Sequence, residues 1–140
     1  MTSRALWTSL FAPTIADIQA LAESAWVRMP DTFRNHLGGL AILVEDFPDD
    51  ETLAELGIES PFDLLGLYRG IDLTRRSVSD VSVEPTMIFL YRRPLLDAWA
   101  EGENTLGALV THVLVHEIGH HFGLSDEAME AIEDAAQPLP

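Results

Sequence analysis

Cysteine is absent from all 140 residues of the chain, and its absence excludes several kinds of chemistry. Disulfide bonds, thiolate nucleophiles and cysteine-ligated zinc sites are ruled out, so any zinc must be held by histidines and carboxylates. A chain without cysteine also suits a reducing compartment, and we expect a cytoplasmic protein.

Lysine is absent too, because all eight basic residues are arginines. A Schiff-base lysine and the lysine of a phosphate-binding loop are therefore excluded. The 23 acidic residues outnumber these arginines and give a formal net charge of −15. Such a charge repels polyanions, so we expect neither nucleic acid nor a membrane as a partner.

Hydrophobic runs long enough to cross a bilayer are also missing. The short apolar patch near the N-terminus is interrupted by Thr8, Ser9 and Pro13, and no clear signal-peptide cleavage site follows it. With 47% hydrophobic residues, the chain has the length and composition of one globular unit. We expect a single domain over residues 1–140, with residues 1–13 as a flexible start and no signal for a particular oligomeric state.

The most informative stretch is His116–Asp126, which reads H-E-x-x-H-x-x-G-x-x-D. On a helix, His116 and His120 lie one turn apart, about 6 Å along the axis and about 40° around it. Both imidazoles then project from one face and can bind the same ion. The pattern predicts one Zn²⁺ per chain, with His116 and His120 as ligands.

Glu117 and Gly123 complete the chemistry that this motif predicts. Glu117 lies about 100° further round the helix than His116, where it reaches a water beside the metal better than the metal itself, as a general base should. Gly123 can adopt a left-handed conformation that ends the helix and turns the chain. That turn would bring Asp126 to the metal as a third ligand. Two nitrogens and one carboxylate leave a fourth position open, as in catalytic zinc sites.

This motif resembles that of the metzincin branch of zinc peptidases, in the version with aspartate as third ligand. Four segments also resemble small single-domain bacterial zincin-like proteins, namely Ala41–Pro48, Leu64–Gly70, Thr86–Pro94 and His116–Met129. The resemblance implies a zincin fold, in which the substrate cleft runs between a sheet edge and the motif helix. One departure is that metzincins carry a methionine turn well downstream of the third ligand. Here Met129 follows Asp126 by only three residues, so we expect Met129 to belong to the core.

The identity of the third ligand has alternatives in this sequence. Glu130 or Glu133 could replace Asp126, in the manner of zincins whose glutamate ligand comes from a later helix. His112 lies one turn before His116 and about 12 Å along the axis from His120. We therefore interpret His112 as an orienting or core histidine rather than a ligand.

The remaining pattern predicts an α+β domain, with a small sheet of about three strands packed against several helices. The expected strands are 40–45, 64–70 and 87–92, and the motif helix, at about 104–121, should be central and buried. Other helices are expected at 14–27, 51–56 and 126–136, with a short helix or turn after Pro30 and a further helix from Pro94. Their expected capping residues are Thr14, Asp49 or Asp50, Asn104 or Thr105, and Ser125.

Glu45 to Glu51 form an acidic segment with the sequence EDFPDDE. It could bind a cation or the basic side chain of a substrate. We favour an exposed loop that caps the following helix, because no spaced calcium-binding pattern is present.

Tyr68 and Tyr91 could each donate a hydrogen bond to an oxyanion. Both are more typical of strand aromatics that pack against a helix. Arg92 and Arg93 are expected to pair with acidic side chains rather than to hold a substrate carboxylate.

The sequence therefore predicts a zinc-dependent metallopeptidase in which Glu117 activates water for attack on a peptide bond. Its substrate would be a peptide or a protein. An alternative keeps the fold and the zinc in a regulatory or interaction domain with a single target or without peptidase activity. Glu117 argues against a purely structural site, which would not need a general base.

Overall fold

The computed structural model describes residues 3–37, 39–69 and 86–138. The helices and strands in these ranges are α1 (Ser3–Ser9), α2 (Ile15–Arg28), α3 (Asp31–His36), β1 (Leu40–Glu45), α4 (Asp50–Leu56), the 3₁₀ turn η1 (Pro61–Asp63), β2 (Gly66–Arg69), β3 (Thr86–Tyr91), α5 (Arg92–Glu101), α6 (Leu106–His121) and α7 (Asp126–Ala136). Within the described part of the chain, no helix is both long and apolar enough to span a bilayer.

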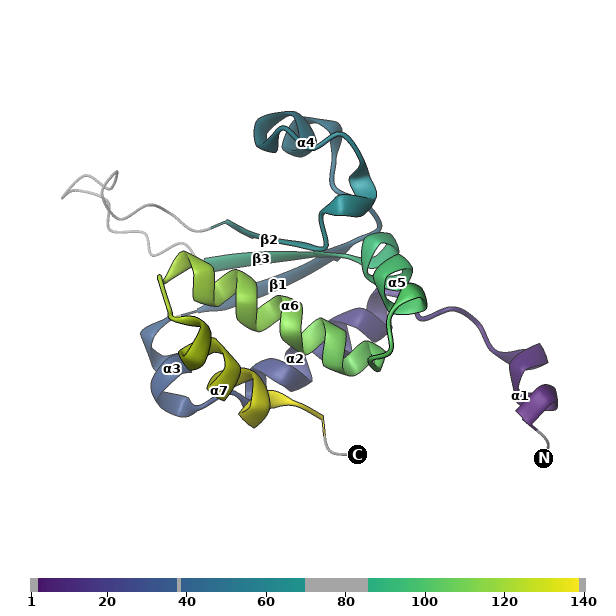
Figure 1. Cartoon of the computed structure of the whole chain (residues 1–140), viewed down its shortest axis with the longest axis horizontal. Helices are drawn as coiled ribbons and strands as arrows, with labels where there is room; N and C mark the ends of the chain where they lie inside the picture. The colour runs from purple at the N-terminus through teal and green to yellow at the C-terminus, as the bar shows by residue number, and fades with distance from the viewer. Residues whose placement is uncertain (1–2, 38, 70–85, 139–140) are drawn as a thin grey trace.

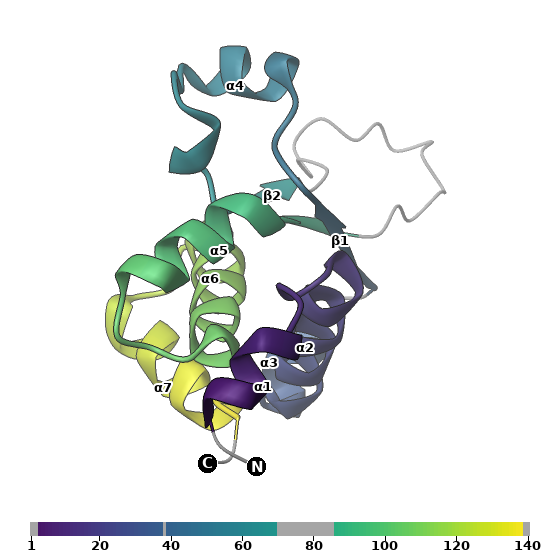
Figure 2. The ribbon, with the colours of Figure 1, turned by 90° about the vertical axis from the view of Figure 1, so that its right-hand side faces the viewer.

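A three-stranded mixed sheet organises the molecule, with the strand order β1-β3-β2. β1 and β3 are parallel, and their register runs from Leu40 opposite Thr86 to Glu45 opposite Tyr91. β2 is antiparallel to β3 and forms one edge of the sheet. Figures 1 and 2 show α2, α6 and α7 on one side of this sheet and α4 on the other. The predicted α+β class with about three strands is confirmed.

The hydrophobic core lies between the sheet and the helices beneath it. α6 is its central element, as the sequence predicts, because four of its apolar side chains have no exposed surface. These are Val110, Leu114, Val115 and Ile118. Side chains of α2 and β3 meet them, in particular Ile18, Ala22, Ile88 and Leu90. A helix packed so completely on one face can hold its opposite face in a fixed position toward solvent.

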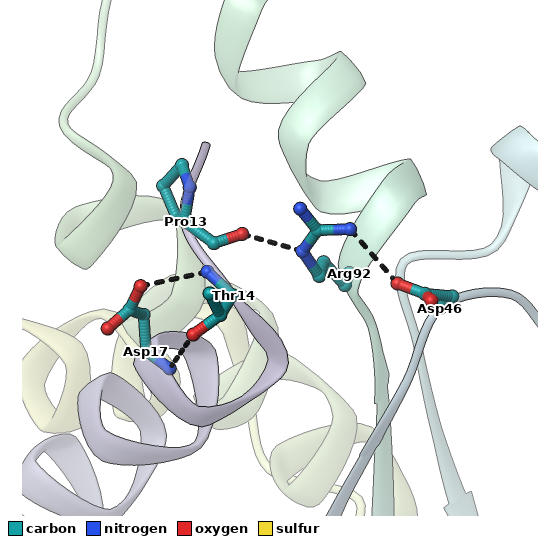
Figure 3. Close-up of polar contacts among 5 residues, drawn as sticks. All are labelled: Pro13, Thr14, Asp17, Asp46 and Arg92. Carbon is teal, nitrogen blue, oxygen red and sulfur yellow. Dashed lines mark hydrogen bonds and ion pairs between the residues drawn. The ribbon is translucent and has the colours of Figure 1, made fainter. Parts of the chain in front are cut away.

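Capping residues set most of the helix boundaries that the sequence predicts. The Thr14 hydroxyl accepts from the Asp17 backbone while the Asp17 carboxylate accepts from the Thr14 backbone, which is a complete capping box (Figure 3). Asp49 rather than Asp50 caps α4, and Thr105 rather than Asn104 caps α6. β1 and α7 have the predicted bounds.

β3 lies at Thr86–Tyr91 rather than 87–92, and α5 begins at Arg92 rather than at Pro94. Two other segments differ more from the sequence-based expectation. The strand expected over 64–70 is shorter, because β2 covers Gly66–Arg69 and residues 70–85 lie outside the described part of the chain. The N-terminal stretch contains α1, for which the sequence predicted no helix. A helix of seven residues is too short to show a clear apolar period, and Leu6 and Trp7 on it are exposed.

Arg92 joins three parts of the chain that are distant in sequence. Its Nε donates to the Pro13 carbonyl at 2.6 Å, and its Nη1 lies 3.1 Å from the Asp46 carboxylate (Figure 3). The start of α5 is thereby tied both to Pro13, which precedes the cap of α2, and to Asp46, which follows β1. The expected pairing of Arg92 with an acidic side chain is confirmed.

Replacing Arg92 by methionine should lower the free energy of unfolding by about 1–3 kcal/mol, because a charged hydrogen-bond donor is lost from both acceptors. Denaturant unfolding of the two proteins measures the change. Arg93→Met is the matched control, since Arg93 is exposed and lies over the Phe47 ring at 5.7 Å. That control should cost less than about 1 kcal/mol. Equal losses in both variants would contradict the role assigned to Arg92.

Candidate metal centre

Three histidines form a row along the solvent side of α6 at a spacing of four residues. The ring centroids of His112 and His116 are 4.0 Å apart, and those of His116 and His120 are 5.8 Å apart. His116 is partly buried, whereas His112 and His120 are exposed. The buried opposite face of α6 keeps this row in place, as the motif spacing predicts.

A left-handed glycine within the motif, Gly123, follows the end of α6. Gly123 has a φ of 65°, and its backbone N–H donates to the His120 carbonyl at 3.2 Å. The Leu124 N–H donates to the Gly119 carbonyl at 2.9 Å, which completes a Schellman turn. Ser125 then caps α7, so that Asp126 becomes the first residue of that helix. The predicted turn at Gly123 is confirmed.

α7 packs back along α6, and its Glu133 reaches the histidine row. Glu133 Oε1 lies 2.8 Å from His112 Nδ1, and its Oε2 lies 3.5 Å from His116 Nε2. The Glu133 side chain is 18% exposed, whereas Asp126 and Glu130 are exposed residues. Of the three carboxylates considered from sequence, Glu133 is the one that this structure brings into contact with the histidines.

A zinc ion can be tested against this donor set. Zinc is bound by histidine, aspartate and glutamate side chains. Among the described residues, one group of three has all its ligand atoms within 4.8 Å of one another, namely His112, His116 and Glu133. Two ligands at about 2.0–2.2 Å from a tetrahedral ion are themselves about 3.3–3.5 Å apart. The His116 Nε2 to Glu133 Oε2 separation of 3.5 Å matches that spacing. Imidazole nitrogens and a carboxylate oxygen are also ligands that zinc accepts.

The predicted set of His116, His120 and Asp126 does not meet the same distance criterion with the side chains as they lie. It stays a prediction. His112 is not the core histidine that was considered, because half of its side chain is exposed. Its hydrogen bond to Glu133 fits the other interpretation, in which one side chain orients another.

Glu117 lies on the side of α6 that faces the edge strand β2. It is partly buried, and burial raises the pKa of its carboxyl group above the usual value. The charge of His120 and a hydrogen bond from the Tyr68 backbone act against that rise in pKa. The predicted general base is therefore held between the histidine row and the backbone of the sheet edge.

Tyr68 covers the next turn of α6 beyond Glu117. Its ring stacks on His121 with centroids 3.6 Å apart and meets Phe122 edge-on at 6.2 Å. The Tyr68 hydroxyl lies 3.5 Å from the Thr86 hydroxyl. This is the strand aromatic packed against a helix that the sequence favoured, and His121 beneath it is an exposed residue.

The pairing of Glu133 with His112 was not predicted from sequence. A signal for it exists, because Met129 and Glu133 are four residues apart and share one face of α7. Once Met129 is assigned to the core, Glu133 must also face α6. The sequence does not show the packing register of the two helices, which decides which residues of α7 lie beside which residues of α6.

Comparison with known proteins adds a family assignment to this geometry. The family model for zincin-like metallopeptidases matches residues 37–136. The chain belongs to the zincin-like metallopeptidase family. A search of curated proteins found no match to this chain. The matched range of this zincin-like chain runs from Leu37, at the end of α3, to the end of α7, and it contains the histidine row, Glu117 and Glu133.

Gly119 of α6 lies directly against the side chain of Met129 on α7 in this zincin-like site. A Cβ atom at Gly119 would lie 2.4 Å from the Met129 Sδ and 2.6 Å from its Cγ. Met129 is only 1% exposed, so its side chain has little room to move away. The missing side chain at Gly119 therefore allows α7 to approach α6, and the confirmed core position of Met129 depends on it.

Gly119→Ala should destabilise the protein by about 1–3 kcal/mol through overpacking, which outweighs the gain of up to about 1 kcal/mol that alanine brings to a helix. In a Met129→Ala background the same change should instead be neutral or stabilising. Denaturant unfolding of both singles and the double variant measures this coupling. Additive effects would contradict the proposed contact.

Proposed function

We propose that this protein is a zinc-dependent metallopeptidase with a metzincin-type motif. One observation carries the proposal: Glu117 is half-buried between a row of imidazoles on its own helix and the backbone of an edge strand. A purely structural zinc site needs no carboxylate beside its ligands. A hydrolase needs one within reach of both the ion and the peptide bond.

The ligands in this proposal are His116 and His120, with Asp126 as the third, as the motif spacing predicts. Glu133 is the competing carboxylate, supported by its contacts with His112 and His116. Two roles fit Glu133. It either binds the ion directly, or it orients the histidine row through its hydrogen bond with His112 and its contact with His116. The two roles differ in how much zinc affinity the loss of Glu133 would cost.

Zinc held there would polarise a substrate carbonyl and lower the pKa of water to about 7. The rest of the chemistry falls to side chains of the chain itself. Glu117 would accept a proton from the attacking water and pass it to the leaving amine. Its partial burial raises the pKa of the carboxyl group and makes the carboxylate a stronger base, which favours the first of these two transfers.

The edge of the sheet supports a peptide as the substrate. β2 pairs with β3 on one side, and no other described strand pairs with it. An extended peptide could add to its free edge through backbone hydrogen bonds. Such a peptide would run past Tyr68, whose backbone lies beside Glu117. The metal, the base and the peptide bond would then meet at one place.

Glu117→Gln should leave zinc binding intact and lower kcat/KM by about 10²–10⁴, because the amide cannot accept the proton of water. Elemental mass spectrometry and cleavage of a peptide library measure the two properties. Glu101→Gln, an exposed change on α5, is the control and should alter neither. A Glu117→Gln protein as active as the wild type would remove Glu117 from this role.

The ligand set can be tested by zinc affinity. The wild type should bind about one zinc per chain, and His116→Ala or His120→Ala should weaken binding by more than about 100-fold. If Asp126 is the third ligand, Asp126→Ala should behave like these two variants. Glu133→Gln should then cost only about 10–100-fold, as expected for an orienting group.

The reverse order, with Glu133→Gln the more damaging change, would make Glu133 the ligand and Asp126 a surface residue. A wild-type protein that takes up no zinc at neutral pH would end the hydrolase proposal. Zinc binding without cleavage of any peptide would favour the alternative of a regulatory or interaction domain.

A further inference from the structure

A cavity lies on the face of the sheet opposite α6. It is a cavity of about 290 Å³ beneath α4, lined by Glu45, Asp49, Glu51, Thr52, Glu55, Arg69, Phe89 and Tyr91. Figure 1 shows α4 on this side of the sheet and α6 on the other. The acidic segment singled out in the sequence therefore forms part of a cavity wall rather than only an exposed loop.

The charges in this wall are unbalanced. Arg69 is already engaged, since its Nη2 lies 3.1 Å from Glu55 Oε2 and 3.2 Å from Thr52 Oγ1. Asp49 accepts from the Thr52 backbone at 2.7 Å as the cap of α4. Within the described residues, the side chains of Glu45 and Glu51 form neither an ion pair nor a hydrogen bond. Two carboxylates on the rim are thus available to a cation.

A buried tyrosine supplies an independent sign of a ligand. Tyr91 is 2% exposed, and no hydrogen bond joins its hydroxyl to another described residue. Within the described ranges every fully enclosed side-chain oxygen has a partner, so the unpartnered Tyr91 hydroxyl keeps some exposed surface, and Tyr91 lines this cavity. Burial, and next the charge of Glu45, raise the pKa of Tyr91, which keeps the hydroxyl neutral.

We propose that this cavity binds the guanidinium or ammonium group of a basic side chain in a peptide substrate. Glu45 and Glu51 would accept its hydrogen bonds at the rim, and the Tyr91 hydroxyl would accept one inside. The ring of Phe89 would pack against the aliphatic part of the side chain. The substrate assignment rests on the proposed peptidase function, whereas the binding of a basic group does not.

An organic cation fits the lining better than a metal ion. Hard divalent cations require six or more oxygen ligands, and the aromatic floor and the Arg69 guanidinium do not provide them. The volume lies at the lower end of the range for small-molecule sites, which suits a single side chain.

The cavity is also within reach of a peptide on the edge of the sheet. Along β2, Tyr68 faces α6, and Leu67 and Arg69 alternate with it toward the cavity face. A peptide paired with β2 would alternate its side chains in the same way. One set would point toward the metal centre and the other toward the acidic cavity.

Binding of N-acetyl-argininamide and of its neutral isostere N-acetyl-citrullinamide to the wild-type protein tests the proposal directly, by calorimetry or NMR titration. The arginine compound should bind at least about tenfold more tightly, and its affinity should fall as salt is raised. The double change Glu45→Gln and Glu51→Gln should weaken it by about tenfold or more and reduce the salt dependence. Tyr91→Phe, which keeps the ring, should weaken it by about three- to tenfold.

Glu101→Gln is the matched control, because it removes one acidic charge from α5 outside the cavity, and it should leave binding unchanged. Equal affinity for the two amides, no binding of either at millimolar concentration, or unchanged affinity in the double variant would overturn the proposal. These titrations do not require catalysis, so they separate a failure of the cavity from a failure of the peptidase function. If peptides are cleaved, arginine-containing ones should lose their advantage over citrulline-containing ones in the double variant.

Discussion

The contact between Gly119 and Met129 is the constraint on which the rest of the site depends. Because Gly119 has no side chain, α7 can lie against α6 at the level of the motif. The Schellman turn at Gly123 supplies the reversal that brings α7 there. Met129 then fixes how far α7 extends along α6, and Glu133, one turn further on, arrives beside His112 and His116. A packing contact between two uncharged residues thus determines which carboxylate meets the histidines.

α6 separates two chemical environments on its exposed half. The histidine row faces Glu133 of α7, while Glu117, on the neighbouring side, faces the backbone of β2. Burial destabilises the charged form of Glu117 and raises its pKa, while the charge of His120 and the Tyr68 backbone act against that rise. The position of β2 at the sheet edge matters here, because an interior strand would leave no backbone groups for a substrate.

Local chemistry explains which features the sequence predicted well. The bounds of β1 and α7, the caps at Thr14 and Ser125, and the turn at Gly123 all follow from residues adjacent in the chain. The meeting of Glu133 with His112 and the cavity beneath α4 depend on how whole elements pack, which no local pattern encodes. The acidic segment illustrates the difference. Its cap at Asp49 was predictable, whereas its place opposite Phe89 and Tyr91 required the sheet register.

The acidic composition also bears on metal choice. With 23 carboxylates and no cysteine, the chain offers many oxygen ligands, which suit hard cations such as calcium and magnesium. Imidazole shifts that preference toward zinc and its neighbours. In the described ranges, the α6–α7 face is the place where two imidazoles and a carboxylate come close enough to share an ion. The histidine row therefore offers ligands that zinc accepts, whereas the lining of the acidic cavity on the other face has no imidazole and suits an organic cation.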